Sequence, residues 1–273
     1  MKIPLHGRLV LVGAGKMGGA LLEGWLREGM NPGKVSVIDP APPPDSKGLI
    51  EKAGIALNPQ MSRLTDAEAV VIAVKPQSAD AAMPHIAPLK TSRPLVLSVV
   101  AGKTIAYFEK TFGGDAAIIR TMPNTPAAVG RGITAMTTNR NVSEAQRTLA
   151  NALLSAVGEV VTVEEERHID AVTALSGSGP AYVFFLTECL SEAGRKLGLP
   201  EDVATRLARA TVAGAGELMW RSGLPAATLR ENVTSPKGTT YAALQVLMRE
   251  NGMMKLFEEA LAAAEKRSRE LAG

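Results

Sequence analysis

The residues with the clearest chemical meaning form a glycine-rich stretch near the N-terminus, Gly13-Ala14-Gly15-Lys16-Met17-Gly18. This G-x-G-x-x-G pattern is weakly informative alone. Here an apolar run leads into it and an amphipathic segment leaves it, as in the strand–loop–helix units that bind a dinucleotide pyrophosphate. The glycines allow the tight turn, the approach of the phosphates and the packing of helix on strand, and N–H groups at the helix start face the anion. We therefore predict a dinucleotide site, against the alternative of a glycine-rich turn without function.

Two charged residues follow the next predicted strands. Asp39 ends the strand of residues 34–39. An acid at that place accepts hydrogen bonds from the adenine ribose hydroxyls and repels a 2′-phosphate, although an aspartate can also simply open the proline-rich turn that follows. Lys75 comes directly after the apolar run 69–74, at the sheet edge where ligands bind. It could contact ribose or phosphate, or make an exposed salt bridge.

A second candidate site is a hydroxyl-rich loop, Thr234-Ser235-Pro236-Lys237-Gly238-Thr239-Thr240, which enters a predicted helix. Free N–H groups at a helix start favour a carboxylate, and the hydroxyls can add hydrogen bonds. A plain N-cap needs only one hydroxyl, so this loop predicts a carboxylate site. The stretch Ser176-Gly177-Ser178-Gly179-Pro180 is sufficient as helix-capping chemistry, but its small residues would also let a ring approach closely.

These residues require a scaffold, and residues 1–164 supply alternating strand and helix signals. Apolar runs without polar alternation are typical of parallel strands covered on both faces, and the rhythm predicts a doubly wound, Rossmann-like, mostly parallel sheet. The expected strands are 8–12, 34–39, 69–74, 94–100 and 116–121, with 133–138 and 159–163 as edge strands. Helices are expected at 16–28 and 143–157, with helical segments between the other strands and a loop through the prolines of 40–44.

Residues 165–273 carry helix signals only, so we expect an all-helical second domain that begins near Glu164-Glu165-Glu166. Its first helix is expected at 170–175. The helix 201–221 contains several small residues, and glycine inside a helix costs roughly 1 kcal/mol against alanine. Either close packing within the chain or a partner chain would compensate. The other expected helices are 180–197, 225–231, 239–249 and 254–271.

The composition excludes several classes of protein. Apolar residues make up 46% of the 273 residues and the net charge is +3, with no Lys/Arg block typical of nucleic-acid or membrane-surface binding. The three histidines lie far apart, which disfavours a metal site. Cys189 is the single cysteine, so we expect a buried thiol in a cytoplasmic protein. The apolar run near the N-terminus is too short for a signal peptide, and no segment predicts a transmembrane helix.

Five segments together resemble the pyrroline-5-carboxylate reductase family, and the resemblance covers nearly the whole chain. They occur in the family's order, and the last two are the most specific. The segments are the glycine loop, Val74-Lys75-Pro76-Gln77, Arg120-Thr121-Met122-Pro123-Asn124-Thr125-Pro126, Leu175-Ser176-Gly177-Ser178-Gly179-Pro180-Ala181-Tyr182 and Val233-Thr234-Ser235-Pro236-Lys237-Gly238-Thr239-Thr240.

The resemblance implies reduction of 1-pyrroline-5-carboxylate to L-proline, the last step of proline biosynthesis, by hydride transfer from NADPH or NADH. It also implies a helical C-terminal domain that forms a homodimer or a higher oligomer built from dimers. It assigns the cofactor to Gly13, Gly15, Lys16, Met17, Gly18, Val74, Lys75, Pro76 and the segment 99–101, which includes Ala101. It assigns the substrate carboxylate and ring to Ser235, Gly238, Thr239 and Thr240, with Thr240 at the ring nitrogen.

Two residues depart from the family pattern. Lys237 stands where the family often has glycine, and Asp39 stands where members that prefer NADPH carry small polar or basic residues. Asp39 therefore makes NADH a plausible cofactor. The two motifs contain no strong acid, so we expect Thr240 to position the ring nitrogen and relay a proton from water, or the substrate to arrive already protonated.

Two other functions compete with this one. A hydroxyacid dehydrogenase of similar plan would carry a catalytic lysine on the long helix soon after its glycine-rich segment, and residues 177–190 contain none. A non-catalytic dinucleotide sensor would retain the fold without the reaction, and only turnover distinguishes it.

Overall fold

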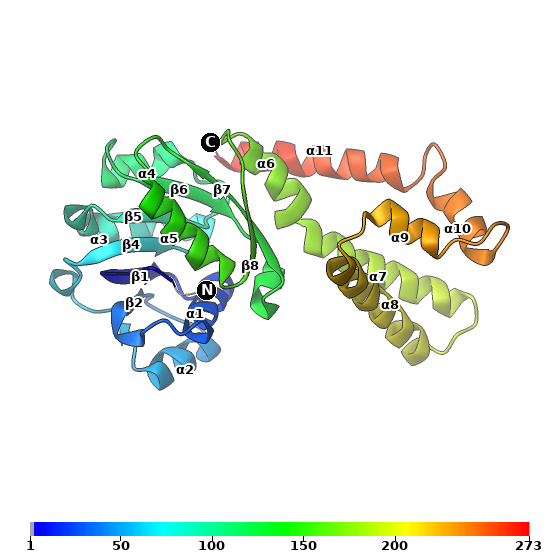
Figure 1. Ribbon diagram of the computed structural model, residues 1–273, viewed down its shortest axis with the longest axis horizontal. Helices are drawn as coiled ribbons and strands as arrows, with labels where there is room; N and C mark the ends of the chain where they lie inside the picture. The colour runs from blue at the N-terminus through cyan, green and yellow to red at the C-terminus, as the bar shows by residue number, and fades with distance from the viewer. Residues whose placement is uncertain (1–2, 273) are drawn as a thin grey trace. The chain divides into compact units, whose positions relative to one another are not determined.

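Eight strands form one sheet in the computed structural model, which describes residues 3–272 (Figure 1). Their order across the sheet is β3-β2-β1-β4-β5-β6-β7-β8. Every neighbouring pair is parallel except β6 and β7. The strands are β1 (Arg8–Val12), β2 (Val35–Ile38), β3 (Ala56–Leu57), β4 (Ala67–Ile72), β5 (Leu95–Ser98), β6 (Ile118–Met122), β7 (Gly132–Thr138) and β8 (Gly158–Thr162).

The Rossmann-like sheet is confirmed, with one correction at its edges. Residues 133–138 and 159–163 were expected as two edge strands. Both strands form, but β7 lies between β6 and β8 and is therefore interior. The second edge is β3, a two-residue strand that has too few residues to show any period in the sequence. On either side of β1 the strand order runs in opposite directions, so the crevice between the carboxyl ends of β1 and β4 is the switch point where doubly wound sheets bind ligands.

Alternate residues of the central strands point to opposite faces of the sheet, and each face has its own core. One core contains Leu9, Val71 and Leu97, and the other contains Val10, Val70 and Val96. This burial on both sides explains why these strands are apolar throughout. Residues of α1 (Lys16–Arg27), α2 (Pro44–Ala53) and α5 (Glu144–Ser155) complete the first core, and residues of α3 (Ala79–Ile86) and α4 (Ile105–Phe112) complete the second.

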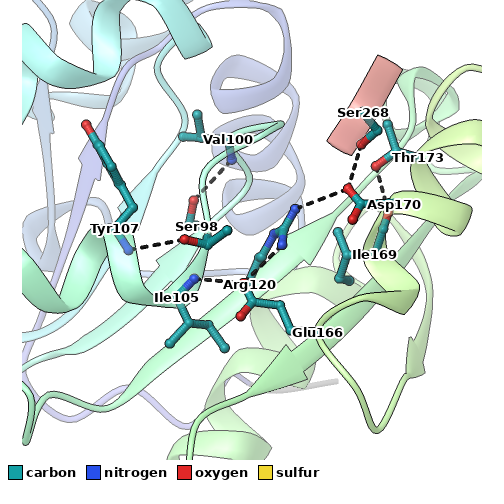
Figure 2. A network of polar contacts seen from close by, with 11 residues as sticks. Ser98, Val100, Ile105, Tyr107, Arg120, Glu166, Ile169, Asp170, Thr173 and Ser268 are labelled. Carbon is teal, nitrogen blue, oxygen red and sulfur yellow. Dashed lines mark hydrogen bonds and ion pairs between the residues drawn. The ribbon is translucent and has the colours of Figure 1, made fainter. Parts of the chain in front are cut away.

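Arg120 lies on β6 and is buried, with 2% of its surface exposed. Its Nη1 donates a hydrogen bond of 3.0 Å to Oε1 of Glu166, and its Nη2 lies 3.8 Å from Oδ1 of Asp170 (Figure 2). Glu166 Oε1 also accepts the N–H of Ile105, the first residue of α4, at 2.8 Å. The hydroxyl of Ser268 donates to Asp170 Oδ1 at 2.7 Å. We call Arg120, Glu166, Asp170 and Ser268 the arginine cluster.

Ser268 belongs to α11 (Met253–Ala272), so the arginine cluster joins a sheet strand to a distant helix. The chain divides into two compact units. Unit 1 comprises the residues up to Gly177 together with those from Ala264 onward, and unit 2 comprises Ser178–Ala263. Unit 1 thus extends past the change from strands to helices near residue 164, because α6 (His168–Val172), the π-helix Thr173–Gly177 and the end of α11 belong to it.

Unit 2 consists of helices in the described chain, as the sequence predicts. They are α7 (Gly179–Lys196), α8 (Glu201–Ser222), α9 (Ala226–Asn232), α10 (Thr239–Leu247) and the first part of α11. The helix expected at 170–175 forms as α6 followed by the π-helix. The expected burial of Cys189 is wrong, because α7 leaves this thiol exposed.

Large apolar side chains also remain exposed on these helices, among them Phe184, Phe185, Trp220 and Met254. A side chain added at Gly214 or Gly216 of α8 would meet no atom within 4 Å. Close packing within the chain therefore does not explain these two glycines. One helical run, His168–Lys196, has the length and the apolar composition to cross a membrane, a weak criterion that core helices of other proteins also pass.

The arginine cluster yields a stability prediction. Arg120→Met fills a similar volume but leaves Glu166 and Asp170 close together without their cation, and removing one partner of a buried ion pair costs about 3 kcal/mol. We expect a loss of that order in the free energy of unfolding, measured by urea denaturation at fixed protein concentration. The matched control is Arg140→Met at an exposed position, which should change stability by no more than about 0.5 kcal/mol. A loss at Arg120 no larger than that of the control would contradict this role.

Candidate functional site

Two glycines of the loop between β1 and α1 are required by the backbone around them. Gly13 has a φ of +91°, and a Cβ there would lie 2.8 Å from the carbonyl oxygen of Ala73. A Cβ at Gly18 would collide with the carbonyl oxygen of Gly13. These contacts bring the start of α1 against β1 and against the end of β4. The fold alone therefore explains glycine at both positions.

Gly15 differs from its two neighbours in the pattern. Its φ is −66°, which any residue adopts, and a Cβ there would meet nothing within 4 Å. It is the N-cap of α1 and provides no side-chain cap, so the first N–H groups of that helix lack a side-chain partner. Nothing in the described fold requires glycine here. The open space above the helix start fits a bound pyrophosphate, which must approach the backbone closely.

Asp39 lies beside this loop, at the end of β2. Its Oδ2 accepts the N–H of Ala14 at 2.7 Å, and its Oδ1 accepts the N–H of Ala41 at 2.9 Å. The carboxylate therefore belongs to the glycine loop as well as to the turn that it opens. A carboxylate has about four lone-pair positions, so two remain for a ribose placed at the mouth of the loop.

The segment Val74-Lys75-Pro76 comes after β4, at the carboxyl ends of the strands, where the glycine loop also lies. The N–H of Ala73 donates to the carbonyl of Val12 at 2.7 Å, which aligns the end of β4 with the end of β1. Val74 is half-buried, while Lys75 and Pro76 are exposed. In the part of the chain that the structure describes, Lys75 makes no ion pair. The exposed salt bridge considered for this lysine is thus not formed, and its ammonium group is available to an anion.

The loop after β5 lies at the same carboxyl ends of the strands. Val100 is buried in the core and donates its N–H to the Ser98 hydroxyl at 3.2 Å, so of the segment 99–101 only Val99 and Ala101 present surface. Ala101 packs on the small core that holds Met122. Gly102 has a φ of +73°, and a Cβ there would lie 3.1 Å from the carbonyl oxygen of Leu271. The end of α11 therefore packs closely against this loop.

A surface cluster joins the starts of α3 and α4 next to this loop. The hydroxyl of Tyr107 donates to Asp80 at 2.7 Å, and the ammonium group of Lys103 reaches the same oxygen at 3.0 Å. These two hydrogen bonds lower the pKa of Asp80. Burial, together with the neighbouring carboxylate, raises the pKa of Tyr107. The tyrosine therefore stays neutral, and the cluster holds the two helices at fixed places beside the loop.

Asn124 was quoted in the sequence only as part of a motif, and the structure gives it a specific place. Its side-chain oxygen accepts the N–H of Ile133 at 3.0 Å, and its Nδ2 donates to the Ser176 hydroxyl at 3.3 Å. A Cβ on Gly177 would lie 3.3 Å from the sulfur of Met122. Asn124 thus attaches the serine- and glycine-rich stretch to the carboxyl end of β6. The sequence did offer one signal for Asn124: an amide side chain, which can both donate and accept a hydrogen bond, close to the end of a predicted strand.

The hydroxyl-rich loop lies in unit 2 and opens α10. The N–H of Gly238 closes a turn onto the Ser235 carbonyl at 3.1 Å, and Lys237 in that turn has a φ of +59°. Glycine adopts such a φ without strain, so Lys237 holds a backbone conformation that glycine would adopt more easily. Thr239 and Thr240 begin the helix without a side-chain cap. Among the described residues, their hydroxyls and that of Ser235 make no hydrogen bond, so all three remain available.

No group of three His, Cys, Asp or Glu side chains with the geometry of a metal site occurs within residues 3–272. The residues predicted for the dinucleotide are gathered at one sheet edge of unit 1. Those predicted for the carboxylate are gathered in one loop of unit 2. Each group is internally consistent in geometry.

The contrast between Gly15 and Gly18 generates a matched pair of variants. Gly15→Ser retains a good N-cap but fills the open space, so we expect unchanged stability and dinucleotide binding weakened about 10- to 100-fold. Gly18→Ser forces a side chain into the Gly13 carbonyl, and overpacking of this kind costs about 1–3 kcal/mol. Thermal unfolding and calorimetric titration of the dinucleotide distinguish the two effects. Normal binding by Gly15→Ser would refute the placement of the pyrophosphate.

Two family models match different parts of the chain. A family model described as "Pyrroline-5-carboxylate reductase dimerisation" matches residues 166–271. A second model, described as "NADP oxidoreductase coenzyme F420-dependent", matches residues 8–102. The pyrroline-5-carboxylate reductase of Pseudomonas aeruginosa is 40% identical over 265 residues, which cover 97% of each chain. That of Mycobacterium tuberculosis is 39% identical over 97% of this chain and 96% of its own.

Solved structures give the same result. A pyrroline-5-carboxylate reductase from Coxiella burnetii superposes with a TM-score of 0.90 at 34% identity and covers 98% of this chain and 99% of its own. The Plasmodium falciparum pyrroline carboxylate reductase with NADP bound has a TM-score of 0.81 at 27% identity, with the same coverage. Since the relatives match along the whole length and over both motif-bearing units, the chain belongs to the pyrroline-5-carboxylate reductase family.

Proposed function

We propose that this chain reduces 1-pyrroline-5-carboxylate to L-proline with NAD(P)H, and that the hydroxyl-rich loop is where the substrate binds. The observation that carries the assignment is the set of free hydroxyls of Ser235, Thr239 and Thr240 at an uncapped helix start. Such a loop suits a small anion with a ring. A family membership that spans 97% of the chain supplies the reaction.

The loops at the carboxyl ends of the strands would hold the cofactor. Gly13, Gly15 and Gly18 leave room for the pyrophosphate against the N–H groups of α1, with the exposed Lys16 and the half-buried Met17 flanking it. The ammonium group of Lys75 would offer a positive charge to the anionic part of the cofactor, and Val74, Pro76 and Ala101 would line the same end of the sheet. When bound, NAD(P)H supplies the hydride, and these residues supply distance and orientation.

The substrate carboxylate would lie at the start of α10. The first N–H groups of that helix and the helix dipole favour negative charge there. Ser235 and Thr239 add hydroxyl donors, and the turn closed by Gly238 keeps them together. The ring then lies next to Thr240, one residue further along the helix.

Thr240 would act on the ring nitrogen. Reduction adds a hydride to the imine carbon and a proton to the nitrogen, so a protonated imine is the better acceptor. A threonine hydroxyl is a poor acid, so the proton comes from water or arrives with a substrate that is already protonated. The Thr240 hydroxyl donates a hydrogen bond to the unprotonated nitrogen or accepts the N–H of the protonated imine, and this contact keeps the nitrogen in place while the carbon receives the hydride.

The helical unit would serve as the dimer interface. Its exposed apolar residues and the two open glycines of α8 need a cover that the described chain does not supply. The dimerisation model spans this region. We propose a homodimer, or a larger oligomer built from dimers, in the cytoplasm, with no membrane or nucleic-acid partner.

The activity test mixes the purified protein with pyrroline-5-carboxylate and either NADH or NADPH and follows the absorbance of the reduced cofactor. Turnover is expected with at least one cofactor. A dinucleotide sensor would bind the cofactor without oxidising it, so binding without turnover would overturn the proposed reaction.

Thr240→Ala tests the role at the ring nitrogen. Loss of one positioning hydrogen bond should lower kcat about 10- to 100-fold, with cofactor affinity near normal. Thr148→Ala, on the exposed side of α5, is the matched control and should retain full activity. Wild-type turnover by Thr240→Ala would exclude the assignment.

A further inference from the structure

A second polar residue lies beside the end of β2, and both of its side-chain hydrogen bonds go to the backbone of Asp39. Asn58 follows the short strand β3. Its Oδ1 accepts the N–H of Asp39 at 2.8 Å, and its Nδ2 donates to the carbonyl of Asp39 at 2.8 Å. Its own N–H donates to the carbonyl of Val37 at 2.7 Å. The side chain of Asn58 thus hydrogen-bonds to both the N–H and the C=O of Asp39, as the backbone of a longer β3 would do.

The backbone of Asn58 is adapted to this task. Its φ is +50°, in the left-handed region, which asparagine enters more readily than most residues. A side-chain amide can also donate to the C=O and accept from the N–H of one residue. A strained conformation at an exposed strand end calls for an explanation, and the two hydrogen bonds to Asp39 provide one.

The result is a fixed negative charge at the mouth of the glycine loop. Both Asp39 oxygens are directed by the N–H groups of Ala14 and Ala41. In the part of the chain that the structure describes, no Lys, Arg or His forms an ion pair with Asp39. Neutral N–H donors orient the carboxylate but do not cancel its charge.

The turn that follows offers few backbone donors to a 2′-phosphate. Three prolines, Pro42 to Pro44, remove backbone donors from the turn and from the start of α2. The first turn of that helix adds Asp45, a second negative charge. The next cation, Lys47, pairs with Glu51 at 3.9 Å. A phosphate on the adenine ribose would therefore meet two carboxylates before it reached a cation on this segment.

We infer that this chain selects NADH over NADPH, and that Asn58 is the positioning residue that holds Asp39 against the adenine ribose. The inference rests on the proposed dinucleotide site. Asp39 accepts the ribose hydroxyls and excludes the 2′-phosphate by charge. The hydrogen bonds of Asn58 go to the backbone of Asp39 and Val37, so its role is to keep Asp39 at a fixed distance from the glycine loop.

Direct titration of the full chain with NADH and with NADPH, without substrate, tests the selection. The wild type should bind NADH about 100-fold more tightly, the size expected for like charges a few ångströms apart that solvent partly screens. Asp39→Ser should weaken NADH, strengthen NADPH and bring the two dissociation constants to within about tenfold of each other. Tighter binding of NADPH by the wild type would overturn the selection.

Asn58→Gly tests the positioning role. Glycine accepts the left-handed backbone, so only the two side-chain hydrogen bonds are lost. NADH binding should weaken about five- to tenfold, with NADPH binding unchanged and kcat at saturating NADH unchanged. Asn31→Gly removes another side-chain cap in an exposed turn and is the matched control, with both affinities retained.

The outcomes separate the two inferences. An equal loss for both cofactors in Asn58→Gly would reduce Asn58 to a structural residue and overturn its role. Absence of binding by either cofactor in the wild type would overturn the proposed dinucleotide site itself. Preference for NADH in binding, followed by no turnover with pyrroline-5-carboxylate, would leave the selection intact and refute only the proposed reaction.

Discussion

The buried guanidinium of Arg120 determines how the elements around the loop after β5 are held together in unit 1. The guanidinium of Arg120 is out of water, and its Nε and Nη2 have no hydrogen-bond partner within the described residues. Its charge is tolerable only because Glu166 and Asp170 lie next to it, since an uncompensated buried charge costs several kcal/mol. Each of those acids in turn holds another element, Glu166 at the start of α4 and Asp170 at α11 through Ser268.

This dependence reaches the candidate cofactor site. The start of α4 and the end of α11 enclose the loop after β5, where Ala101 and Gly102 lie. Val100 anchors the loop in the core, and the elements around the loop are held by the arginine cluster, whose members lie on a strand, a connecting segment and two helices. Elements far apart in sequence thus converge beside the candidate cofactor site.

Local patterns in the sequence were sufficient for most of the fold. The apolar runs of β1, β4 and β5, and the glycines at 13 and 18, express constraints that act within a few residues. β3 was missed because two residues have no period, and β7 was misplaced because sheet order depends on pairing between distant strands. The exposure of Cys189 was missed because the sequence of an apolar helix face does not show whether the same chain or another molecule covers that face.

The same distinction holds at the site. Gly15, Lys75 and Asp39 could be selected from spacing alone, because each lies within three residues of the end of a strand. The roles of Asn58, Asn124 and Arg120 could not, because each depends on partners brought close by tertiary folding. A polar residue at a strand end is common, and only geometry shows which of them hold another residue in place.

The return of α11 to unit 1 has a consequence for synthesis on the ribosome. Asp170 and Ser268 are 98 residues apart in the chain, and all of unit 2 is made between them. The strands of unit 1 can pair as they emerge, but the cover over Asp170 cannot form until α11 has left the exit tunnel. During that interval the nascent sheet carries an incomplete charge network, so a pause within unit 2 prolongs exposure of an unfinished edge to chaperones and proteases. Unit 1 begins to fold first and finishes only after unit 2 has been made.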